Sequence, residues 1–179
     1  STTRSDTSSL RYLCLEHFKS LKGSFSSFVN LRSLKLNYMT SISFQSDMFN
    51  DLVNLKSLDI SYNELKDQML PNGLFNGLVN LEELEIKSCN FKTIPDCLFS
   101  PLVSLRVLDL HEYEARGLNA DTFKGLENLR KLKIYNIESK LFTLDLFMNF
   151  KALERMDVYP ISQELTNQLK AKFPKIKLY

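Results

Sequence analysis

The 179-residue sequence contains few of the residue types that build catalytic sites or disulfide-stapled scaffolds. It has no tryptophan, two histidines, three cysteines, five glycines and five prolines. Three cysteines without a C-x-x-C pair make neither a disulfide framework nor a structural zinc site. No apolar run approaches the roughly 18 residues of a membrane-spanning helix.

Charge of one sign is also scarce. The chain carries 23 Lys and Arg against 21 Asp and Glu, a formal charge of +2 without a polybasic run. This balance argues against a nucleic-acid or membrane-surface role that depends on bulk charge. Apolar residues make up 44% of the chain and exclude wholesale disorder. Leucine is abundant, with 32 copies, so one residue type supplies most of the core.

Two apolar motifs recur in register along most of the chain. The motif L-x-x-L-x-L, with Ile, Met or Val at some positions, starts at intervals of 21 to 26 residues, most often 24. Its seven copies begin at Leu10, Leu31, Leu55, Leu81, Leu105, Leu129 and Leu153. An F-x-x-L-x-x-L motif, with Phe at its middle position in two copies, precedes all but the first and begins at Phe25, Phe49, Phe75, Phe99, Phe123 and Phe147. A fixed period near 24 residues predicts tandem structural repeats.

The spacing within each repeat predicts its local structure. Apolar residues two positions apart point to the same face of a β-strand. One coil cannot bury its own apolar face, whereas stacked coils bury a continuous leucine core with a phenylalanine spine. We therefore predict an α/β solenoid, an arc with a concave parallel β-sheet and an irregular or short-helical convex side.

These motifs resemble the leucine-rich repeat family, in particular the 24-residue animal extracellular subclass of Toll-like receptor ectodomains. The resemblance implies ligand recognition on the concave sheet. It also implies a ladder of buried Asn side chains that bond the turns after the strands. Only Asn63 supplies that Asn, and Cys89 holds the same place in the next coil. Because the other coils lack this Asn, we expect a less regular arc. The cysteine-rich caps of such solenoids are also missing, so we expect either an excised segment or ends that are closed differently.

The chain divides into three parts by composition. Residues 1–9 form a polar segment, residues 10–160 hold seven repeats, and residues 161–179 are expected to cap the C-terminal end. Ser162 is a candidate N-cap for a helix over residues 163–172, and Pro174 would stop that helix. Alternating residues 175–178 predict a final edge strand.

The exposed columns of the predicted sheet give the candidate ligand-binding residues. Three carboxylates, Asp59, Glu85 and Asp109, would lie side by side on consecutive strands. Five of the seven tyrosines would face the concave surface: Tyr12, Tyr38, Tyr62, Tyr135 and Tyr159. The predicted ligand-binding set is Tyr38, Asp59, Tyr62, Glu85, Asp109, His111, Tyr135 and Tyr159. Tyrosine is enriched at binding hot spots, and the carboxylates suit a partner with a basic surface.

A plainer interpretation of the same columns is also open. Tyrosine favours strands, and carboxylates on an exposed sheet are solvated. Adjacent like charges nevertheless destabilise a sheet, so three in a row require a reason. A neighbouring basic column is expected to pair with nearby acids and consists of Arg11, Arg32, Lys56, Arg106 and Arg130.

The sequence lacks the grouped residues that an enzymatic function would require. His17 and His111 lie four coils apart, about 20 Å at strand spacing, and cannot share a site. A metal between Glu85, Asp109 and His111 is conceivable, but an exposed loose cluster is the simpler interpretation. No nucleophile–base pair or phosphate-binding loop is identifiable. We expect no catalytic activity, no cofactor, no metal and no nucleic-acid partner.

Two functional hypotheses follow. The first is a protein-recognition module of a cell-surface or secreted receptor in innate immunity or development, with a protein ligand or co-receptor. The second is a free-standing repeat protein, extracellular or cytoplasmic, that acts as an adaptor or scaffold or binds microbial molecules. Homodimerisation through a solenoid end or lateral edge is compatible with both.

Overall fold

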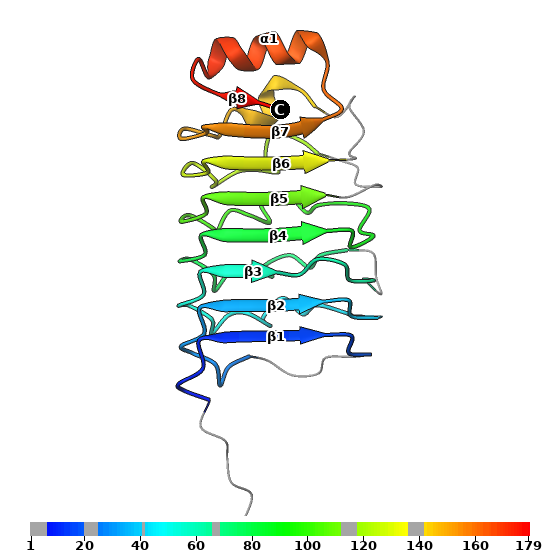
Figure 1. Ribbon diagram of the computed structural model, residues 1–179, viewed down its shortest axis with the longest axis vertical. Helices are drawn as coiled ribbons and strands as arrows, with labels where there is room; N and C mark the ends of the chain where they lie inside the picture. Colours follow the sequence, from blue (N-terminus) through cyan, green and yellow to red (C-terminus); the bar gives the residue numbers. More distant parts are fainter. Residues whose placement is uncertain (1–6, 20–24, 41, 66–68, 112–117, 136–141) are drawn as a thin grey trace, which may run out of the picture.

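A computed structural model shows a solenoid whose coils stack into one parallel sheet (Figure 1). It describes residues 7–19, 25–40, 42–65, 69–111, 118–135 and 142–179. The strands follow the sequence order, and each L-x-x-L-x-L motif contributes one strand. They are β1 (Tyr12–Glu16), β2 (Ser33–Asn37), β3 (Ser57–Asp59), β4 (Glu83–Lys87), β5 (Val107–His111), β6 (Lys131–Tyr135), β7 (Arg155–Tyr159) and β8 (Lys177–Leu178).

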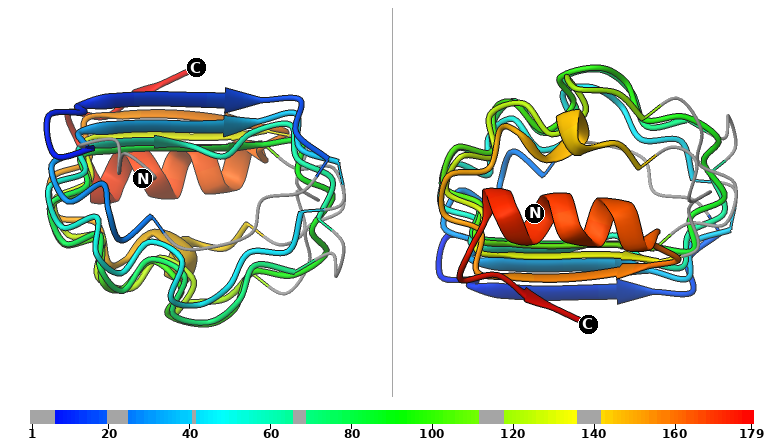
Figure 2. Two further views of the ribbon diagram at one scale, coloured as in Figure 1. Left: turned by 90° about the horizontal axis from the view of Figure 1, so that it is seen from below. Right: turned by 90° about the horizontal axis from the view of Figure 1, so that it is seen from above.

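The repeat motif sets the register of the sheet. Leu58 of β3 is aligned with Leu84 of β4, which is aligned with Leu108 of β5, and all three are fully buried. Seen along the stack, the end strands β1 and β7 project further outward than the middle strands, so the outer face of the sheet is gently concave (Figure 2). The predicted fold class is confirmed.

A spine of phenylalanines fills the side of the core that lies away from the sheet. Phe75, Phe99 and Phe123 come from three successive coils and are fully buried. Their rings stack at centroid distances of 6.0 Å and 6.2 Å. In these three coils the first Phe of the F-x-x-L motif thus packs on the corresponding ring of the neighbouring coil. The return path contains little helix, with one 3-10 turn, η2 (Leu144–Phe147), among the described residues.

The predicted buried Asn is present at one coil. Asn63 Nδ2 donates to the carbonyls of Leu36 (2.6 Å) and Ile60 (2.7 Å), and its Oδ1 accepts from the amide of Met39 (2.8 Å). Cys89 Sγ donates to the carbonyl of Ile60 at 3.1 Å. The two side chains therefore tie three coils together through their backbones, as the sequence predicted.

A second asparagine ladder, which the sequence reasoning missed, lies before the strands. Asn54, Asn80 and Asn128 each donate from Nδ2 to a backbone carbonyl of the preceding coil, at 2.8 to 2.9 Å. The signal was present in the sequence as the recurring dipeptide Asn-Leu at the start of a repeat. This outer asparagine ladder fixes the spacing between the turns that lead into the sheet.

The C-terminal residues form the helix predicted for them. The Ser162 hydroxyl accepts from the amide of Leu165 at 3.1 Å, and α1 (Gln163–Lys172) follows. Leu165 and Leu169 are buried, and α1 lies across the interior of the last coil (Figure 2). The edge strand is shorter than expected, because only residues 177–178 pair with β7. Within the described ranges, no helix is long and apolar enough to cross a membrane.

Two coils approach each other closely at Gly77. A Cβ built there would lie 2.2 Å from the backbone oxygen of Asn50. We expect Gly77→Ala to lower the free energy of unfolding by about 1 to 3 kcal/mol, because the neighbouring coil must shift. Urea denaturation would measure the loss, with Asn76→Ala at the adjacent exposed position as the control. Equal stability of the two variants would contradict the close approach.

Candidate binding surface

The outer face of the sheet carries the carboxylates that the sequence placed side by side. Asp59 is aligned with Glu85, and Glu85 with Asp109, so the predicted order is confirmed. Their expected exposure is not: Asp59 is 9% exposed and Asp109 is 5% exposed. The expectation was wrong because neighbouring side chains of the sheet cover these positions.

Cations of the same face neutralise the carboxylates. Lys87 Nζ bonds Glu85 and lies 3.3 Å from Asp109, and Lys133 Nζ lies 3.0 Å from Asp109. Burial lowers the pKa of Lys87, but the bonds and charges of Glu85 and Asp109 outweigh it and raise the pKa to about 12. This pairing is the reason that three adjacent carboxylates are tolerated.

Asp59 and Asp157 complete this ion-pair network. Asp59 accepts from Asn37 Nδ2 at 2.9 Å and lies 4.0 Å from Lys35 Nζ, and Arg155 Nε lies 3.0 Å from Asp157. Four carboxylates thus face four cations, and the network has no net charge. These carboxylates therefore give no reason to expect a basic partner.

An aromatic stack lies at the edge where the first strands end. The rings of His17 and Tyr38 are 5.1 Å apart and nearly parallel, and those of Tyr38 and Tyr62 are 5.0 Å apart with a 5° interplanar angle. Tyr38 is 44% exposed and Tyr62 is 43% exposed. His17 and Tyr38 directly follow β1 and β2, and Tyr62 lies three residues after the end of β3. There is one ring per coil, so the stacking of the coils holds the rings in line.

The backbone at all three rings is left-handed. The φ angles are 60° at His17, 56° at Tyr38 and 58° at Tyr62. This region costs a residue with a Cβ about 1 to 2 kcal/mol, and bulky side chains adopt it rarely. Ser88, at the same repeat position of the next coil, has a φ of 51°, so this conformation belongs to the turn after the strand and is not confined to the aromatic residues.

The other predicted aromatic residues form a separate group on later strands. The rings of His111 and Tyr135 are 5.6 Å apart and tilted by 50°, and Tyr159 is aligned with Tyr135 and exposed. Burial and then the charge of Asp157 raise the pKa of Tyr135. The β4 coil, with Lys87, separates the two groups. His17 was outside the predicted set, although it occupies the same column as Tyr38.

The expected pairing of the basic column holds at two positions. Lys56 Nζ lies 2.8 Å from Glu82, and Arg130 lies 3.3 Å from Glu154. The bond to Lys56 lowers the pKa of Glu82. Among residues that the structure describes, no three His, Cys, Asp or Glu side chains are grouped as metal ligands.

The architecture defines a class of protein: a tandem-repeat solenoid with a leucine core, a phenylalanine spine and a concave parallel sheet. The family model described as "Leucine rich repeat" matches residues 30–91 and 79–136, more than half of the chain. The chain belongs to the leucine-rich repeat family. Comparison with curated proteins gave no match. Leucine-rich repeat solenoids are protein-interaction modules. The family is generally not enzymatic.

Proposed function

We propose that the chain recognises a protein partner through the concave face of its sheet, with the stack of His17, Tyr38 and Tyr62 as the anchor. The single observation that carries this proposal is the alignment of three exposed rings on three coils. Each ring restricts its neighbour, so little side-chain freedom is lost when a partner covers them. Tyrosine adds a large contact area and a polar tip.

The proposed site has two parts with different roles. The aromatic stack supplies apolar area at the edge where the strands end. The adjacent ion-pair network presents a polar face without net charge, which favours hydrogen bonds over bulk charge attraction. His111, Tyr135 and Tyr159 form a second aromatic group on the C-terminal coils, beyond the β4 coil. A broad protein surface fits this length of sheet better than a small molecule does.

We place this recognition on the outside of the cell, as part of a surface or secreted receptor in innate immunity or development. The support is the 24-residue repeat spacing, which resembles that of Toll-like receptor ectodomains. The second candidate is a free-standing adaptor in a reducing compartment. Cys14 and Cys97 form no disulfide in the part of the chain that the structure describes, which favours this candidate. Surface biotinylation of intact cells, followed by fractionation, separates the two.

The anchor is tested with Tyr38→Asn/Tyr62→Asn. Asparagine tolerates left-handed backbone, so the variant should remain folded while it loses both rings. We expect a partner captured by the wild-type chain from a cell-surface extract to bind this variant roughly tenfold or more weakly, as loss of tyrosine hot spots does. Binding would be measured by surface plasmon resonance once the partner is identified.

A matched control removes exposed apolar side chains elsewhere. Met69→Ala/Met148→Ala changes two exposed residues outside the strands, and its affinity should equal that of the wild-type chain. A partner that binds the Tyr variant and the wild-type chain equally would move the binding site away from the concave face. Circular dichroism of all three proteins would verify their folding.

A further inference from the structure

The edge where the strands begin carries an excess of positive charge. The residue after the first leucine of each repeat forms a basic flank, which comprises Arg11, Arg32, Lys56, Arg106 and Arg130 together with Glu82 and Glu154. Five cations against two acids leave three positive charges, whereas the whole chain has a formal charge of +2. Since the ion-pair network on the face of the sheet is neutral, the positive potential of the repeat strands lies on this flank.

A stripe of exposed valines runs beside the basic flank. It has one member on each of four successive coils, each between 42% and 51% exposed: Val29, Val53, Val79 and Val103. The carbonyls of Val29, Val53 and Val103 accept the bonds of the outer asparagine ladder, which therefore holds this valine stripe in register with the arginines. Single exposed valines are ordinary, but a regular row beside a charged row is an amphipathic surface.

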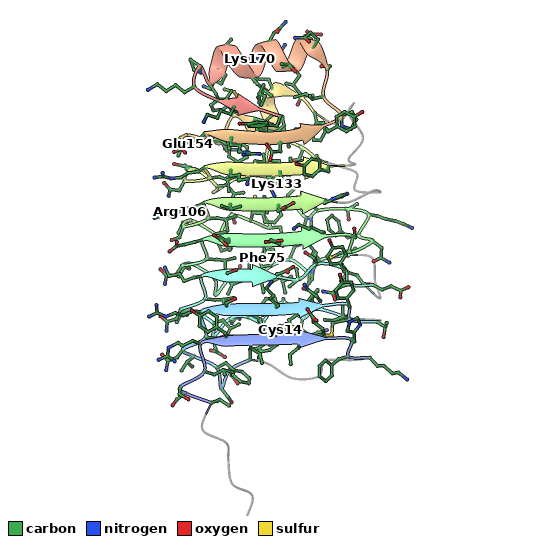
Figure 3. The ribbon with its side chains drawn as sticks, in the orientation of Figure 1. Cys14, Phe75, Arg106, Lys133, Glu154 and Lys170 are labelled. Carbon is green, nitrogen blue, oxygen red and sulfur yellow. The ribbon has the colours of Figure 1, made fainter. Side chains whose placement is uncertain are left out.

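A groove opens where the outer asparagine ladder is interrupted. Ser104 and Ala152 occupy ladder positions that hold Asn in other coils. Together with Val103, Arg106, Asn128 and Arg130 they line a groove of about 410 Å³. Figure 3 shows Arg106 and Glu154 projecting at the edge where β5 and β7 begin.

Two of the three cations that line this groove are paired with acidic residues, and the third is Arg106. Lys56 and Glu82 pair with each other at 2.8 Å, and Arg130 pairs with Glu154 at 3.3 Å. Arg106 forms no ion pair within the described part of the chain, although its charge adds to that of Lys56 in lowering the pKa of Glu82. Guanidinium groups bind carboxylates in a planar, bidentate manner.

We propose that the basic flank and the valine stripe together bind an acidic, partly apolar segment of a partner protein. An Asp or Glu carboxylate of that segment lies in the groove against Arg106, with the paired Arg130 as a second cation beside it, and an apolar side chain packs on Val103. The cationic row selects negative charge, while the valines select a peptide over a purely polar polyanion such as a sulfated glycan. This surface lies at the opposite edge of the sheet from the aromatic stack and shares no residue with it.

The test is selection of a random peptide library on the immobilised wild-type chain. We expect enriched peptides that combine Asp or Glu with apolar residues. Their affinity should fall roughly tenfold or more in Arg106→Gln/Arg130→Gln, as loss of arginine hot spots predicts, and severalfold in the isosteric Val79→Thr/Val103→Thr. The control Lys92→Gln/Lys175→Gln removes the same charge from two exposed sites elsewhere and should bind as the wild-type chain does.

Three results would overturn the proposal. One is an absence of enriched peptides, and another is enrichment of peptides that lack acidic residues or bind the arginine variant equally well. The third is heparin retention that depends on the arginines but not on the valines, in the absence of peptide binding, which would assign the flank to a polyanionic glycan. Thermal denaturation of each variant verifies folding, and the aromatic variant Tyr38→Asn/Tyr62→Asn should keep its peptide affinity.

Discussion

Phe99→Ala should lower the free energy of unfolding by about 3 to 5 kcal/mol, because it removes a fully buried ring from the middle of the spine. Phe99 stacks on Phe75 on one side and on Phe123 on the other. In a solenoid each coil is stabilised chiefly by its two neighbours, so one cavity weakens two interfaces. Urea denaturation followed by circular dichroism would measure the loss.

Exposed positions of the same coils provide the control for this prediction. Val79→Ala and Val103→Ala shorten side chains on the outer surface and should change stability by no more than about 0.5 kcal/mol. Hydrogen exchange of the β4, β5 and β6 amides should also accelerate in the Phe99 variant. If the loss stayed below about 1 kcal/mol, the ring would not be part of a tightly packed spine.

We expect Asn63→Ala to lower the free energy of unfolding by about 3 kcal/mol, because the substitution leaves several buried backbone groups without a hydrogen-bond partner. The Met39 amide loses its acceptor, and the Leu36 carbonyl loses a donor at 2.6 Å. Both groups lie inside the solenoid, where water does not replace the side chain. Thermal and urea unfolding of the purified variant would give the size of the effect.

Two substitutions separate this effect from a general loss of asparagine. Asn63→Cys should retain part of the stability, since Cys89 makes a similar bond in the next coil. Asn54→Ala removes one exposed hydrogen bond of the outer asparagine ladder and should lower the free energy of unfolding by only about 1 kcal/mol. Equal losses for Asn54→Ala and Asn63→Ala would contradict a special role of the buried side chain.

Much of the fold was predictable from local spacing. The L-x-L pair at Leu34 and Leu36 indicates a strand because residues two apart share a face, and its recurrence at Leu58 and Leu84 sets the parallel register. The helix after Ser162 was predictable because an N-cap, two leucines four apart and a stopping proline all lie within one short segment. Each of these features depends on neighbours in sequence.

The chemical state of the candidate site was not predictable in the same way. The column at Asp59 and Asp109 looked acidic and exposed in sequence, but Lys35 reaches Asp59, and Lys87 and Lys133 reach Asp109. Whether a lysine crosses to the next strand depends on side-chain conformation and burial, and local spacing contains neither. The alignment of the Tyr38 and Tyr62 rings likewise depends on the left-handed backbone at both residues.

The sequence by itself determined the repeat, the strands, the leucine core, the phenylalanine spine and the capping helix, because hydrophobic periodicity decides which face of each coil is buried. Tertiary structure alone decided that the acidic centre is neutral, that three rings stack at one edge, and that arginines and valines share the other. Residues about 24 positions apart become neighbours at strand spacing only after stacking, so their charges and rings interact only in the folded solenoid.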